Sequence, residues 1–208
     1  PQVDMVSFTG STRAGKRVGE LASQSIKRVA LELGGKSASV ILADADLEAA
    51  VKGSISACML NSGQTCSAHT RMLVPESRYE EVKKIAQTAI AKLSIGPSLD
   101  ENTRLGPLVS AAQRDRVLHF IEVGLKEGAE LVAGSGDKPA FDKGYYVQPT
   151  ILRVKATDTL AREEIFGPVL VILTYKDEEE AIRIANDSPY GLGGGVWGQD
   201  EAHATAVA

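Results

Sequence analysis

The feature that most constrains the fold is the alternation of short apolar runs with long amphipathic stretches. The runs Val29–Leu33, Ala38–Leu42 and Val169–Tyr175 are apolar and carry β-branched residues, which predicts strands. The stretches 76–93 and 110–127 place apolar residues at helical spacing, which predicts helices between strands. Because strands separated by long helices pair in parallel, we expect an α/β fold with a mostly parallel open sheet flanked by helices.

Further elements follow from the same patterns and from capping residues. Asp46 is placed to cap a helix that carries Leu47 and Ala50, and Asp177 opens a helix to Ala185. We expect a Gly-, Ser- and Pro-containing loop over Gly134–Gly144. The other expected elements are strands at 5–8, 70–74, 147–154 and 193–197, and a helix at 12–27 with Val18, Leu21, Ala22 and Ile26 facing inward.

Composition excludes several classes of protein. The 208 residues are 43% hydrophobic with a net charge of -4, and no apolar run approaches the roughly 18 residues of a membrane span. Charges of both signs are interspersed, so no polybasic surface for nucleic acid or lipid is indicated. Two cysteines without CxxC spacing make neither a disulfide framework nor a zinc site. We expect a soluble cytoplasmic protein with no nucleic-acid partner, membrane partner or metal.

The segment Leu31–Ala38 places a carboxylate, Glu32, among apolar residues and glycines. A buried carboxyl group has a raised pKa, which is the direction that a general base near neutrality requires. Pairing of Glu32 with Arg28 or Lys36 for structural reasons is the alternative interpretation. Glycines at 34 and 35 would let the backbone approach a ligand closely.

The second chemical segment ends at Cys66. The approach from Asn61 to Thr65 is polar and contains a glycine, so it can expose the thiol and offer it backbone N–H groups. Cys58 instead lies on an apolar helical face and is expected to be a small buried hydrophobe. A thiol nucleophile and a carboxylate base are the two parts of covalent thiol catalysis.

A third segment, Gly10–Lys16, lies between an expected strand and an expected helix. Unpaired backbone N–H groups and the helix dipole favour an anion at such a turn. The segment fits the first seven positions of a P-loop, but Arg17 stands where Ser or Thr would be needed to hold magnesium. Phosphate transfer is therefore disfavoured.

These segments occur in one order along the chain, with Glu32 and Cys66 lying 34 positions apart (66 minus 32). Together with Glu163–Pro168 and Asn186–Leu192 they resemble the NAD(P)-dependent aldehyde dehydrogenase superfamily. The resemblance implies an aldehyde dehydrogenase-like fold, a small aldehyde as substrate and NAD or NADP as cofactor. It implies that Cys66 forms a thiohemiacetal and then a thioester, and that Glu32 activates the water that hydrolyses it. The cofactor contacts that it implies are Gly10, Ser11 and Gly15 at the pyrophosphate turn, Leu33, Glu164 at the nicotinamide ribose and Phe166 near the ring.

The resemblance also predicts the domain organisation. Residues 1–33 are similar to the last part of a dinucleotide-binding domain, and residues 34–208 to a catalytic domain truncated at its C-terminal end. Pro1 lies just before an apolar run and Ala208 lies inside a helix-like segment, so we expect a piece of a longer protein. The parent is expected to be a homo-oligomer, a dimer or tetramer, and the isolated chain to be inactive.

Three alternatives stay open. A related enzyme could release the thioester to coenzyme A, although that branch generally lacks the general base that Glu32 would supply. The chain could be an inactive module with a binding or assembly role. A thiol hydrolase is disfavoured because no histidine shares a motif with Cys66.

Overall fold

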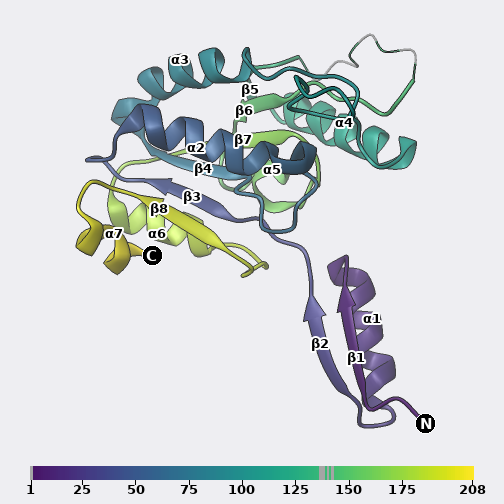
Figure 1. Ribbon diagram of the computed structural model, residues 1–208. Helices are drawn as coiled ribbons and strands as arrows, with labels where there is room; N and C mark the ends of the chain where they lie inside the picture. The colour runs from purple at the N-terminus through teal and green to yellow at the C-terminus, as the bar shows by residue number, and fades with distance from the viewer. Residues whose placement is uncertain (1, 136–138, 140, 142) are drawn as a thin grey trace.

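The computed structural model describes residues 2–135, 139, 141 and 143–208 (Figure 1). Within this part of the chain the strands form a two-stranded sheet, β1-β2, and a six-stranded sheet in the order β5-β6-β7-β4-β3-β8. The strands are β1 (Met5–Thr9), β2 (Arg28–Glu32), β3 (Ala38–Ile41), β4 (Arg71–Pro75), β5 (Glu130–Ala133), β6 (Thr150–Arg153), β7 (Val169–Tyr175) and β8 (Gly194–Trp197). The helices are α1 (Thr12–Ser23), α2 (Leu47–Met59), α3 (Tyr79–Ile90), α4 (Ala111–Lys126), α5 (Thr159–Arg162), α6 (Glu178–Asn186) and α7 (Glu201–Val207).

Strand pairing confirms the expected fold class. β3 pairs in parallel with both β4 and β8, and β7 pairs in parallel with both β4 and β6. Only β5, among the described strands, runs antiparallel to its neighbour, β6. The sequence patterns did not predict β5, because this four-residue edge strand begins at the charged Glu130 and shows too short an alternation.

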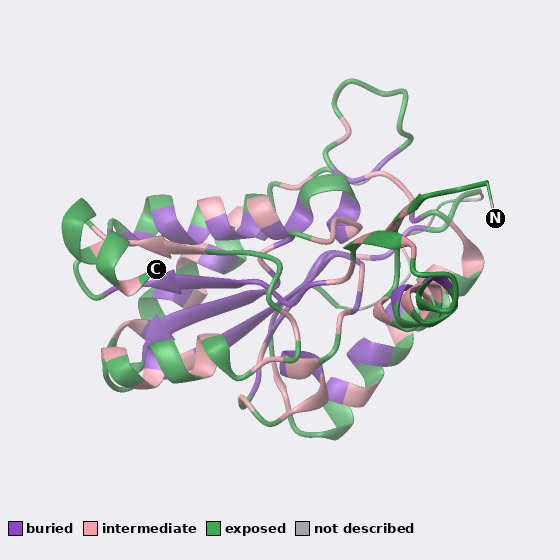
Figure 2. Ribbon diagram, turned by 90° about the horizontal axis from the view of Figure 1, so that it is seen from below, coloured by how far each residue is buried: buried purple, intermediate pink, exposed green. Residues whose placement is uncertain are grey.

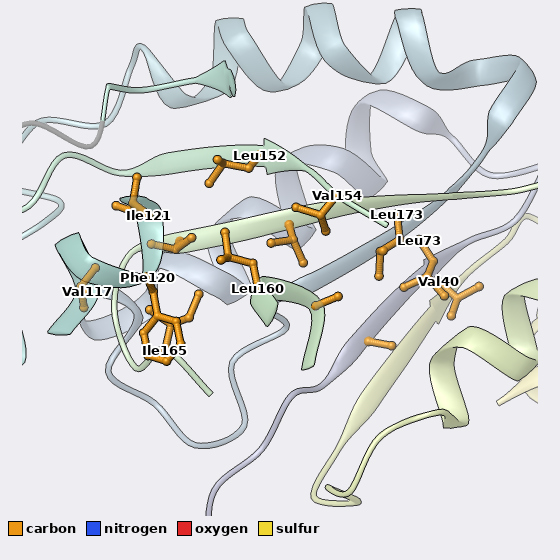
Figure 3. Packing of buried hydrophobic residues seen from close by; sticks show 14 of the residues in the cluster. Val40, Leu73, Val117, Phe120, Ile121, Leu152, Val154, Leu160, Ile165 and Leu173 are labelled. Atoms are coloured by element: carbon orange, nitrogen blue, oxygen red, sulfur yellow. The ribbon is translucent and has the colours of Figure 1, made fainter. Parts of the chain in front are cut away.

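Two apolar clusters cover the two faces of the six-stranded sheet. Alternate residues of β7 divide between them: Val169, Val171 and Leu173 belong to one cluster, and Leu170 and Ile172 to the other. The first cluster is completed by α4, α5 and α6 (Figure 3), and the second by α2 and α3. Both faces are therefore buried, as a parallel sheet requires, and the central strands β3, β4 and β7 form the buried centre of the molecule in Figure 2.

Capping residues begin the helices where the sequence predicts. The side chains of Asp46, Ser110 and Asp177 accept bonds from the backbone N–H three residues on, at 3.1, 3.2 and 2.8 Å. Each bond satisfies a donor that the first helical turn leaves unpaired. These helix starts are confirmed.

The β1–α1–β2 segment differs from expectation. The strand expected at 5–8 is present as β1, with alternate residues exposed, and α1 ends at Ser23 rather than at residue 27. Ala22 is buried as expected, whereas Leu21 is 47% exposed and Ile26 94% exposed with a φ of 55°. The reason is that this sheet has two strands and packs against α1 alone, apart from the larger sheet (Figure 1).

The strand expected at 147–154 is shorter, since β6 covers Thr150–Arg153. The expected loop over Gly134–Gly144 falls partly on residues 136–138, 140 and 142, which lie outside the described residues. No helix in the described part of the chain combines the length and the apolar character needed to cross a membrane.

Candidate active site

A cleft of about 840 Å³ is lined by residues of the two-stranded sheet, of α1 and α4, and of the loops that carry Gly34, Cys66 and Glu164. Cys66 and Glu32, the two residues expected to carry the chemistry, both line it. Five of the six residues expected to contact a cofactor line the same cleft: Gly10, Ser11, Leu33, Glu164 and Phe166. The folded chain therefore brings together residues that lie up to 156 positions apart (166 minus 10).

Gly15 is the expected site residue that does not line the cleft. It is buried in α1, and a Cβ atom there would lie 2.4 Å from Cδ2 of Leu33. Because no side chain fits in that space, Gly15 lets α1 pack against the end of β2. Gly15 thereby contacts Leu33, which itself lines the cleft, and supports that part of the cleft wall.

The pair Gly34-Gly35 passes between two parts of the site. A Cβ atom on Gly34 would lie 2.2 Å from Oε2 of Glu164, and one on Gly35 would lie 2.4 Å from the carbonyl oxygen of Cys66. The backbone N–H of Gly35 donates to Oε1 of Glu164 at 3.1 Å. Only glycine permits this approach, so the pair fixes the Glu164 carboxylate next to the Cys66 backbone.

Cys66 follows a sharp turn at the end of α2. Asn61 and Ser62 have φ values of 51° and 56°, in the left-handed region that non-glycine residues seldom adopt. Past this turn, the hydroxyl of Thr65 donates to the carbonyl of Leu60 at 3.3 Å. The turn ends the helix and leaves the half-buried Cys66 at the cleft.

Cys58 lies on α2, away from the cleft lining. Its side chain is fully buried, and its Sγ donates to the carbonyl of Val169 at 3.5 Å. Burial raises the pKa of the Cys58 thiol to about 12, so the reactive thiolate is scarce at neutral pH. The expectation of a small buried hydrophobe is confirmed.

Limited alkylation of the native chain is expected to modify Cys66 and spare Cys58. The physical reason is access together with the scarcity of the Cys58 thiolate. Iodoacetamide at low molar excess, followed by peptide mapping, measures the two sites together. Both should react equally in denaturant, and preferential labelling of Cys58 in the native chain would contradict the assignment.

Glu32 differs from expectation in its surroundings. It ends β2, and its carbonyl accepts a bond from the N–H of Gly10 at 3.0 Å, which anchors its backbone. The residue is exposed at the cleft rather than buried, as are most residues of the two-stranded sheet. Among the described residues no ion pair joins Glu32 to Arg28 or Lys36, so the structural pairing is not supported.

Lys36 has an environment that the sequence did not predict. Its side chain is 2% exposed, and its Nζ has no hydrogen-bond partner among the described residues. The pKa of Lys36 is lowered to about 7, mainly by burial and in part by Arg71, against the opposing effect of Cys58 and Glu164. An amine whose charged form is costly to bury thus lies in the interior, two positions along the chain from Gly34 of the cleft.

α4 contributes two cleft residues that sequence reasoning missed, Gln113 and Arg116. Both contact the loop that carries Phe166, whose φ is 62°. A bulky residue in this conformation costs about 1–3 kcal/mol and is held only by its surroundings. The missed residues sit on an amphipathic helix outside any motif, where a polar side chain usually faces solvent. The remaining lining residues, which lie in or beside the expected motifs but were not themselves named as contacts, are Thr9, Arg13, Gly34, Asn61, Gln64 and Thr65.

Comparison with known proteins agrees with this geometry. The aldehyde dehydrogenase family matches residues 1–208. The chain is 52% identical over 198 residues to a 3-succinoylsemialdehyde-pyridine dehydrogenase of a Pseudomonas species, covering 94% of this chain and 42% of that protein. It is 48% identical to geranial dehydrogenase of Castellaniella defragrans, covering 100% of this chain and 43% of the relative.

Solved structures are similar over nearly the whole chain. Aldehyde dehydrogenase C of Pseudomonas syringae, determined with NAD+ and octanal, matches with a TM-score of 0.97 at 44% identity, over 99% of this chain and 43% of that one. An aldehyde dehydrogenase of Mycobacterium tuberculosis, complexed with NAD+, matches with a TM-score of 0.96 at 45% identity, over 99% and 43%. The chain thus spans less than half the length of these relatives. By sequence and by fold, the chain belongs to the aldehyde dehydrogenase family.

Proposed function

We propose that this chain is part of a longer enzyme, called here the parent enzyme, that oxidises an aldehyde to a carboxylic acid with NAD(P)+. The observation that carries the proposal is the single cleft lined by the Cys66 thiol, the Glu32 carboxylate and the beginning of α1. Residues 1–33 would end its dinucleotide-binding domain and residues 34–208 would belong to its catalytic domain. The separation of β1-β2 from the larger sheet supports this division. The parent enzyme is proposed to be a cytoplasmic homo-oligomer.

The residues present fit a dinucleotide. α1 begins at the cleft with Ser11 as its cap and no acidic residue in its first turn, an arrangement that favours a pyrophosphate. The guanidinium groups of Arg13 and Arg116 add positive charge to the lining. The Glu164 carboxylate accepts one N–H bond and keeps lone pairs for ribose hydroxyls. When bound, NAD(P)+ supplies the hydride acceptor.

Cys66 would supply the nucleophile. Its thiolate attacks the aldehyde carbon and forms a C–S bond, giving a thiohemiacetal whose oxyanion is stabilised by N–H donors. Loss of hydride from that carbon leaves a thioester on Cys66. Glu32 then takes a proton from water, which attacks the thioester carbon, and the C–S bond breaks to release the carboxylic acid and regenerate the thiol.

A second candidate function is transfer of the acyl group to coenzyme A rather than to water. The presence of Glu32 in the cleft argues against it, because a thiol acceptor needs no water-activating base. A purely binding module, the other alternative, would leave the half-buried Cys66 at the cleft without a role.

The test is turnover by the parent enzyme of a panel of aliphatic and aromatic aldehydes with NAD+ or NADP+, with and without coenzyme A. Cys66→Ala is expected to lower turnover by at least about 1,000-fold, since the nucleophile and its covalent intermediate are lost. Cys58→Ala is the matched control, a thiol removed outside the cleft, and should retain activity. Failure to reduce either cofactor with any aldehyde would contradict the proposal.

A further inference from the structure

Two side chains of α4 bind three successive carbonyl groups of the loop that follows α5. Nε2 of Gln113 donates to the carbonyls of Ile165 and Phe166 at 3.0 and 2.8 Å. Nη2 of Arg116 donates to the carbonyl of Glu164 at 2.8 Å. Gln113 and Arg116 lie one helical turn apart, so they present their donors on the same face of α4.

The bound loop is held in a conformation that Phe166 would not adopt on its own. Its φ of 62° persists where the surroundings over-determine it. On one side Ile165 is buried in the core, and on the other a Cβ atom on Gly167 would lie 2.4 Å from Cγ2 of Val117 in α4. The Gln113 amide binds the carbonyls on either side of the Phe166 N–Cα bond and so fixes the turn between these anchors.

Arg116 is itself held in place. Its guanidinium lies over the Phe120 ring, with 4.7 Å from Cζ to the ring centroid. The other end of Glu164, its carboxylate, is bound by Gly35. Backbone and carboxylate of Glu164 are therefore fixed by two different parts of the fold, α4 and the glycine pair.

We infer that Gln113 and Arg116 are positioning residues, which hold the Glu164 carboxylate and the Phe166 ring at the cleft in the geometry that a dinucleotide needs. The inference rests on the proposed function, because it assumes that Glu164 and Phe166 receive the cofactor. Cofactor binding and the reactivity of the Cys66 thiol should then respond differently to changes in this loop. Loosening the loop should weaken cofactor binding while the Cys66 thiol, held by the turn after α2, keeps its reactivity.

The first test uses hydrogen exchange of this chain. Gln113→Met removes both donors at similar volume and is expected to speed amide exchange over 163–168 about tenfold, because opening of the loop becomes easier. Gln87→Met is the matched control, since Nε2 of Gln87 donates to the carbonyl of Val132 at 2.9 Å outside the cleft. Unchanged exchange over 163–168 in Gln113→Met would overturn the inference.

The second test is a double-mutant cycle in the parent enzyme, with calorimetric titration of NAD+ and the rate of Cys66 alkylation as readouts. Gln113→Met is expected to raise the dissociation constant about tenfold and to change alkylation by less than about twofold. In a Phe166→Gly background the same substitution should raise the dissociation constant by less than about twofold, because glycine adopts a positive φ without help from its surroundings.

One outcome of this cycle would overturn the inference. An undiminished tenfold loss in the Phe166→Gly background would show that Gln113 acts on the cofactor directly, which overturns the positioning role. Phe166→Asn, which also tolerates the left-handed region, repeats the test if the glycine variant does not fold. If the parent enzyme oxidises no aldehyde, the proposed function fails, and hydrogen exchange and NAD+ titration still decide the positioning role.

Discussion

Glu32→Gln in the parent enzyme is expected to give a burst of reduced cofactor followed by a steady state slowed about 100- to 10,000-fold. The amide keeps the shape of the side chain at the cleft but cannot take a proton from water. Thiolate attack and hydride loss do not need that water, so they proceed until Cys66 is acylated. Rapid-mixing absorbance of the reduced cofactor measures the burst and the steady state in one experiment.

The control for this variant is Glu20→Gln, which removes a carboxylate on α1 that pairs with Arg17 outside the cleft. It should show wild-type kinetics. Loss of the burst in Glu32→Gln, together with an unreactive Cys66 thiol, would mean that Glu32 activates the thiol rather than the water. That result would contradict the role assigned to Glu32.

Lys36→Met is expected to stabilise the chain by about 1–4 kcal/mol at pH 7 or below, because it replaces a buried cation by an apolar side chain of similar length. The pKa of Lys36 is about 7 in the folded chain and near 10.5 when unfolded. Between these values the unfolded chain binds more protons, so the stability of the native protein rises with pH through this group. In Lys36→Met this contribution to the pH dependence of stability is lost.

The difference in the free energy of unfolding between Lys36→Met and the unsubstituted chain should therefore decrease as pH rises, by about 2 kcal/mol between roughly pH 6.5 and 8.5. Urea unfolding at several pH values measures it. Lys84→Met, on the exposed face of α3, is the control and should change stability by less than about 0.5 kcal/mol. A destabilised Lys36→Met variant at pH 7, or a difference that increases with pH, would contradict the burial of an uncompensated amine.

The elements that the sequence predicted well are those whose signals are local. Asp46 and Asp177 mark helix starts because the cap bond lies within one turn of each residue. The apolar run at Val169–Tyr175 predicts the strand in full, because both faces of a central parallel strand are buried. The exposure of Leu21 depends on how much of a sheet lies beneath α1, which helical spacing does not encode, and Ile26 lies beyond the end of α1 with a positive φ.

The residues of the candidate site likewise fall into two groups, those marked by local motifs and those that only the fold brings to the cleft. Cys66, Glu32 and Glu164 stand in motifs, and the cleft brings all three together. Gln113 and Arg116 stand in no motif, since their partners are backbone carbonyls about 50 positions away that only the fold brings near. Lys36 does not pair with Glu32, because its side chain lies past the glycine pair, in the buried segment that leads into β3.

The central claim, that Cys66 carries the acyl group, is tested most directly by mass spectrometry of the Glu32→Gln parent enzyme quenched after the burst. Trypsin releases residues 53–71 as one peptide that holds both cysteines, so fragment ions must locate the adduct. The proposed mechanism predicts the mass of the acyl group on Cys66, formed only with both aldehyde and NAD(P)+. An acyl group on Cys58, or a completed burst that leaves Cys66 unmodified, would contradict it.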